Sequence, residues 1–161
     1  MDRFAALPAA EQAAWIARAM LRHRLLSLFE ADRPSSDDVR WLRGLCDDVK
    51  ARVAALTPRR PDLLAAWESA FDVDLFVQMF EHRALEKADA DRIAEVVFER
   101  LELLCAPSQD AAIANVKGVI MEERSVAKKM ALLLEISDAI LTDIEELQRD
   151  ALERLARVTA D

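Results

Sequence analysis

Apolar residues recur every three or four positions along most of the chain, which predicts amphipathic helices. The clearest stripe follows Ser35 and fits a period of about 3.6 residues. It comprises Val39, Leu42, Leu45, Cys46, Val49, Val53 and Leu56. Ser35 and Asp38 have the spacing of a capping box, so we expect this helix to begin at Ser35 or Ser36. The prolines of segment 57–61 end it.

Prolines and capping residues divide the chain into six or seven predicted helices. We expect helices over 8–31, 61–70, 73–80 and 89–106, then a helix that begins at Ser108 and weakens at Gly118, and a long helix over 119–158. The segment after Asp72 is compatible with a strand by residue type, but no partner strand is evident, and we interpret it as a short buried helix with an acidic cap.

The last predicted helix carries a seam of the coiled-coil type. Its apolar positions are Val126, Met130, Leu133, Ile140, Ile144, Leu147, Ala151, Leu155 and Val158, with Ser137 at the one polar position. About forty residues give a rod of roughly 60 Å, whereas a compact domain of this size has a radius of gyration of about 15 Å. We therefore expect the C-terminal half to project, to fold back at a kink, or to pair with another chain.

The 161 residues suit a single all-α domain over 1–161, an irregular bundle of six to seven helices that ends in the long helix. Its parts are an N-terminal helix in 1–33, a central region 34–118 and the long helix in 119–161. The net charge of −8 argues against binding to nucleic acid or to anionic membranes. Because no apolar window approaches a membrane-spanning length and no signal peptide is evident, we expect a cytoplasmic protein without a membrane contact.

Neither a cofactor nor a metal is expected from the motifs present. A di-iron bundle needs Glu three residues before its histidines, and Met20 and Met79 stand there instead. Two glycines are too few for a P-loop or a dinucleotide fingerprint. Cys46 and Cys105 lie on apolar helical faces and are interpreted as buried thiols. We predict from this a protein that is not an enzyme.

Histidine phosphotransfer is an alternative role for His82, provided that Arg83 and Lys87 hold the phosphate on the same helix. A structural histidine near a helix end is the favoured interpretation. The two arginines that follow Pro58, with Arg52 nearby, form a small basic spot that we interpret as a solvated loop.

Three tryptophans, Trp15, Trp41 and Trp67, lie on predicted helices, and core packing is the first expectation for each. Trp41 sits beside the apolar stripe of its helix rather than on it. It is therefore the best single candidate among them for an interface anchor.

The segment 103–110, which reads LLCAPSQD, resembles the hallmark of the T-complex protein 11 family, a Leu-Cys-Ala-Pro run followed closely by Asp. Upstream, Asp72 and Asp74 stand in an Asp-x-Asp-Leu motif like that of the family. His82 stands in a segment similar to the family's Glu-His-Gly-Ala, with Arg83 at the glycine position. The similarity is strongest from 63 to 119.

Read from its residues alone, the hallmark is a capped corner between two helices: Cys105 closes a buried last turn, Pro107 ends it, and Ser108 with Asp110 caps the next helix. The resemblance implies a regulatory module, because eukaryotic relatives are associated with cyclic-AMP and protein-kinase-A signalling. It implies no catalytic residues.

We predict a non-enzymatic helical regulatory or scaffold protein that binds a protein partner through apolar surface on the long C-terminal helix or through the groove beside Trp41. A homodimer through the C-terminal helix is one form that this binding can take. The candidate interface residues are Trp41, Ile140, Ile144, Leu147 and Leu155. The alternatives are a phosphotransfer bundle that uses His82, and a helical domain that binds a small molecule in a pocket between helices.

Overall fold

The computed structural model describes residues 2–105 and 107–160, and this part of the chain is all-helical, as the sequence predicted. A helical turn, α1 (Asp2–Ala5), comes first. The longer helices are α2 (Ala9–Glu30), α3 (Ser36–Leu56), α4 (Pro61–Ala70), α5 (Val73–Glu81), α6 (Lys87–Leu104), α7 (Asp110–Glu122) and α8 (Val126–Ala160). A 3-10 turn, η1 (Pro107–Gln109), leads into α7. The described segments contain no strand, which confirms the helical interpretation of 73–80.

Side chains cap the helices largely where the sequence predicted. The Ser35 hydroxyl accepts from the Asp38 amide at 3.0 Å and the Ser35 amide donates to the Asp38 carboxylate at 3.2 Å, which completes the capping box of α3. The Asp72 carboxylate accepts from the Leu75 amide at 3.0 Å and caps α5. The predicted helix over 89–106 begins two residues earlier, at Lys87, and its last described residue is Leu104; Ala106 lies outside the described residues.

Two predicted boundaries near the last helix are wrong. Gly118 lies inside α7, because a single glycine costs a helix only about 1 kcal/mol and does not have to end it. The break comes at 123–125, where the Ser125 hydroxyl accepts from the Lys128 amide at 3.3 Å and opens α8. Ser108 is not the cap of α7 either: it lies in η1, and Gln109 occupies the N-cap position without a side-chain hydrogen bond.

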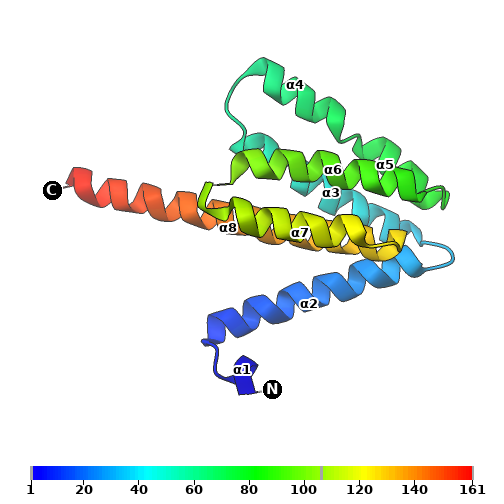
Figure 1. Ribbon diagram of the computed structural model, residues 1–161, viewed down its shortest axis with the longest axis horizontal. Coiled ribbons are helices and arrows are strands. Elements are labelled where there is room, and N and C mark those ends of the chain that lie inside the picture. Colours follow the sequence, from blue (N-terminus) through cyan, green and yellow to red (C-terminus); the bar gives the residue numbers. More distant parts are fainter. Residues whose placement is uncertain (1, 106, 161) are drawn as a thin grey trace.

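Helix α8 is the element on which the bundle is built. It packs against α2, α3, α6 and α7, while α4 and α5 pack on α3 (Figure 1). The predicted stripe of α3 supplies Leu42, Cys46, Val49 and Val53 to the core. Trp67 of α4 is also buried, as predicted, and its indole donates to the Lys50 carbonyl at 3.0 Å.

Two charged side chains of α8 lie inside the bundle. Lys129 is 1% exposed, and its ammonium donates to the Asp91 carboxylate on α6 and, at 3.2 Å, to the Met121 carbonyl. The Glu135 side chain is 0% exposed, and both of its oxygens accept from Arg22 on α2 at 3.1 Å. Buried charges persist where they are paired, so each pair fixes a neighbouring helix to α8.

Candidate interaction surface on the C-terminal helix

The last fifteen described residues of α8, 146–160, leave the bundle and are all exposed; we call them the C-terminal arm (Figure 1). The sequence left three courses open for this half of the helix, and the structure shows that it projects. Four large apolar side chains of the arm face solvent: Leu147, Leu152, Leu155 and Val158. Their spacing of three to five residues places them toward one side of the helix. An apolar stripe on an unpaired helix is a surface suited to a partner helix.

Only part of the predicted seam lies on this surface. Leu147 and Leu155 are exposed, Leu155 by 60%, as an interface residue must be before its partner binds. Ile140 and Ile144 are not: Ile144 is buried and Ile140 is half-buried against the core. Periodicity predicts both residues on the seam, but other helices of the bundle cover that stretch of α8. The interface prediction for these two residues is therefore corrected.

Trp41 is a weaker interface candidate than the sequence suggested. It is half-buried against the core, and the guanidinium of Arg24 lies 4.1 Å from its ring centroid. The exposed tryptophan is Trp15 of α2, which is 58% accessible. Among the described aromatic side chains it contacts only Phe4, and the two ring centroids are 4.9 Å apart. The core-packing expectation holds for Trp67 but not for Trp15.

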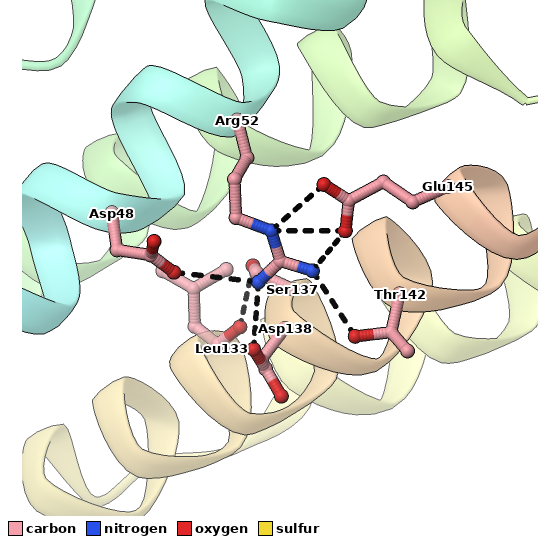
Figure 2. A network of polar contacts seen from close by, with 7 residues as sticks. All are labelled: Asp48, Arg52, Leu133, Ser137, Asp138, Thr142 and Glu145. Carbon is pink, nitrogen blue, oxygen red and sulfur yellow. Dashed lines mark hydrogen bonds and ion pairs between the residues drawn. The ribbon is translucent and has the colours of Figure 1, made fainter.

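Just before the arm begins, Arg52 of α3 is surrounded by polar side chains of α8 (Figure 2). Its guanidinium donates to Asp138 at 2.8 Å, to Thr142 at 3.0 Å and to both oxygens of Glu145, with distances of 2.5 to 3.3 Å. Asp48, one turn earlier on α3, adds a contact at 3.4 Å. We call this group the Arg52 clamp.

The Arg52 clamp holds the last buried turn of α8 next to the start of the arm. The Arg52 side chain is 17% exposed, so its ion pairs are partly shielded from water. The hydrogen bonds that Arg52 donates to Glu145 and then to Asp138 raise the pKa of Arg52 above its usual range and keep it charged. The sequence interpretation of Arg52 as part of a solvated basic spot is wrong.

The residues of the family-like motifs lie at helix ends, as the structural interpretation predicted. Asp72 caps α5, and Asp74 forms an exposed ion pair with Arg43 at 2.5 Å. Cys105 follows α6 and Asp110 opens α7. The backbone of Pro107 begins η1, and its side chain lies outside the described part. Cys105 and Asp110 therefore flank the corner between α6 and α7, whereas Asp72 and Asp74 lie at the start of α5.

His82 is exposed and occupies the C-cap position of α5. Arg83, the next residue, lies beyond the helix at φ 54° and donates to the carbonyls of Ala31 and Asp32 at 2.9 and 2.5 Å. Lys87 belongs to the following helix, α6. The phosphotransfer alternative required these cations on one helix with His82, and that arrangement is not present.

Neither cysteine forms a disulfide within the described residues, and Cys105 is only half-buried, less than expected. Burial raises the pKa of Cys46 from 9.0 to about 12, with a smaller contribution from Asp47. Burial, and then the charges of Asp110 and Glu102, also raise the pKa of Cys105. These environments suppress the thiolate that reactive cysteines need.

We expect Cys46 to react with a disulfide reagent at about pH 8 roughly 1,000-fold more slowly in the folded protein than after denaturation. The measurement is the labelling rate of the Cys105→Ser variant, in which Cys46 is the single thiol. Because the raised pKa delays ionisation in the folded state, stability that is present below pH 9 is lost as the pH rises toward about 12. Fast stoichiometric labelling of the native variant would contradict this account.

Within 2–105 and 107–160 no group of three or more His, Cys, Asp or Glu side chains is placed to hold a metal ion. None of the helices in these segments combines the length and apolarity that a bilayer-spanning helix requires. No protein-family model, curated protein or solved structure matches the chain.

Proposed function

We propose that this protein is a helical interaction module that dimerises by pairing its C-terminal arm with the arm of a second copy. The observation that carries the proposal is the exposed apolar stripe of the arm, which continues α8 beyond the Arg52 clamp. Because this stripe is exposed to water, covering it with a partner helix would bury apolar surface and lower the free energy. A regulatory or scaffold role follows from such pairing, because it places two bundles at the ends of one rod.

The charges of the arm favour an antiparallel arrangement of the two copies. Its first part, 146–153, carries three acids, Glu146, Asp150 and Glu153, and one arginine, Arg149, and its last part, 154–160, carries Arg154 and Arg157 and no acid. In an antiparallel pair the basic part of each arm lies beside the acidic part of the other. A parallel pair would align like charges, which destabilises helix pairs. The arm is thus complementary to itself, as a two-fold interface requires.

A second exposed apolar group supports an interface at this end of the molecule. Trp15, Ile16 and Met20 lie within the first twelve residues of α2, and the N-terminal end of α2 lies at the same end of the bundle as the arm (Figure 1). A second copy that pairs with the arm comes close to this end of α2.

We retain the relation to the T-complex protein 11 family as part of the proposal. Arg83 adopts a left-handed conformation at φ 54°, which favours glycine, and the family usually carries glycine at this position. The hallmark segment forms the corner between α6 and α7, in keeping with a structural motif. Both observations support the relation without adding a catalytic role.

The double substitution Leu152→Glu/Leu155→Glu is expected to weaken dimerisation by at least about 100-fold, because it replaces two apolar side chains of the stripe with charges. The measurement is the solution mass by sedimentation over a range of concentrations. Leu103→Glu, which alters an exposed leucine of α6 outside the arm, is the matched control and leaves the mass unchanged. The unfolding midpoint of every variant is measured alongside.

A charge exchange tests the antiparallel arrangement. Arg154→Glu/Arg157→Glu is expected to weaken the dimer, and the further exchange Glu146→Arg/Asp150→Arg in the same chain is expected to restore it. A wild-type protein that is monomeric at about 0.1 mM, or a dimer that survives the double leucine substitution, would overturn the proposal.

A further inference from the structure

We propose that the groove between α2, α7 and α8 binds a small monocarboxylate with an unbranched apolar chain. The groove encloses about 330 Å³ and is lined by residues of all three helices. This volume is at the small end of the range of ligand pockets, so the groove suits a small ligand. The site is separate from the arm and does not depend on the proposed dimer.

The wall of the groove is mainly aliphatic. Ile113 and Val116 come from α7, and Ile136, Ile140 and Ile144 come from α8. Periodicity alone predicts Ile140 and Ile144 on an interface, but in the structure they line this groove. An apolar wall of this kind binds an alkyl chain through burial alone and imposes no requirement for polar groups along the chain.

The polar side of the groove is provided by Arg18, Arg22 and Glu135. Arg22 donates to both oxygens of the buried Glu135 carboxylate at 3.1 Å and so compensates its charge. The Nε atom of Arg18 lies 3.9 Å from the nearer Glu135 oxygen, beyond hydrogen-bond range. Two guanidinium groups thus face one buried carboxylate. Arg18 is half-exposed and makes no hydrogen bond with the other described residues, so its donors can take a second carboxylate.

Two further polar residues of the lining bear on the choice of ligand. Gln109, at the N-cap of α7, carries an amide that can donate to the same carboxylate. Asp143 carries a negative charge but is exposed, so water screens its effect on an anion at Arg18. Two guanidinium groups beside one buried carboxylate leave a single positive charge in excess at that carboxylate, which suits a monoanion, whereas a phosphate group would require more cations than the groove offers.

Octanoate, which has ten non-hydrogen atoms, is the probe for this site. We expect calorimetric titration of the full chain to give a Kd below about 1 mM. Octylammonium, with the same chain and the opposite charge, is expected to bind at least about ten-fold more weakly. Equal binding of the two compounds would overturn the assignment of Arg18 as the carboxylate partner.

Variants locate the binding site. Arg18→Gln is expected to weaken octanoate binding by about ten-fold, since it removes the charge and keeps Arg22 paired with Glu135. Ala112→Phe adds a ring at an exposed position of the lining and is expected to abolish binding. Arg40→Gln, on the exposed face of α3, is the matched control and leaves the affinity unchanged. Unfolding midpoints confirm that each variant is folded.

Octanoate binding that is unchanged in Ala112→Phe would overturn the proposal, as would the absence of binding by the wild-type protein. The Leu152→Glu/Leu155→Glu variant separates this site from the proposed dimer: we expect it to bind octanoate like the wild-type protein. Binding by that variant alone would show that a second copy fills the groove, and would also contradict the proposal.

Discussion

Replacing Asp91 with alanine is expected to lower the free energy of unfolding by about 3 kcal/mol, because it leaves the buried ammonium of Lys129 without its carboxylate. Lys129 is 1% exposed, and the Met121 carbonyl would be its remaining partner among the described residues. A carbonyl dipole compensates a buried positive charge far less than a carboxylate does. The measurement is urea unfolding at neutral pH, followed by the helical circular dichroism signal.

Two companion variants distinguish the loss of this ion pair from a general effect on α6. Glu95→Ala removes an exposed acid one turn further along the same helix and is expected to change stability by less than about 0.5 kcal/mol. Lys129→Met/Asp91→Ala removes both charges and is expected to recover most of the loss, since an apolar side chain tolerates the site. An Asp91→Ala protein as stable as Glu95→Ala would show that the buried ammonium has other compensation.

Arg52→Ala is expected to cost about 2 kcal/mol, because it leaves three carboxylates near one another with no cation between them. These carboxylates belong to Asp48, Asp138 and Glu145, and each is partly exposed, so the cost is smaller than for a fully buried pair. The same urea experiment measures it. Arg40→Ala, which removes an arginine with a 78% exposed side chain from the same helix, serves as the control and changes little.

Salt separates the electrostatic part of this effect from lost packing. In about 1 M sodium chloride the difference between the wild-type protein and Arg52→Ala is expected to shrink, because the ions screen the repulsion among the remaining carboxylates and weaken the clamp. A difference that is unchanged by salt would mean that the aliphatic part of the arginine, rather than its charge, fixes α3 to α8.

The helices and several of their caps were predictable because they depend on residues close together in the chain. The stripe of α3 and the pairing of Ser35 with Asp38 are of this kind, and both predictions were confirmed. The break before α8 was predicted at Gly118 but lies at 123–125, because an exposed glycine interrupts a helix only weakly and Ser125 caps α8 instead.

The candidate site was only half predictable, because periodicity shows which face of a helix is apolar and not what covers it. The seam of α8 continues without a change of pattern from Ile144, which is buried, to Leu147, which is exposed. In the Arg52 clamp, the partners of Arg52 on α8 are 86 to 93 positions away in the sequence, and no local spacing predicts such contacts. Lys129 and Glu135 were missed for the same reason: each partner lies on a distant helix.

The central position of α8 also affects how the chain is made. Four helices that precede it, α2, α3, α6 and α7, pack on α8, which leaves the ribosome after all of them. Until then their apolar faces have no common partner, so the bundle is expected to remain unfolded or only partly folded in the nascent chain until α8 has been synthesised. Chaperones that bind exposed apolar segments can therefore bind these helices until α8 emerges. The bundle can form fully only after α8 has been synthesised.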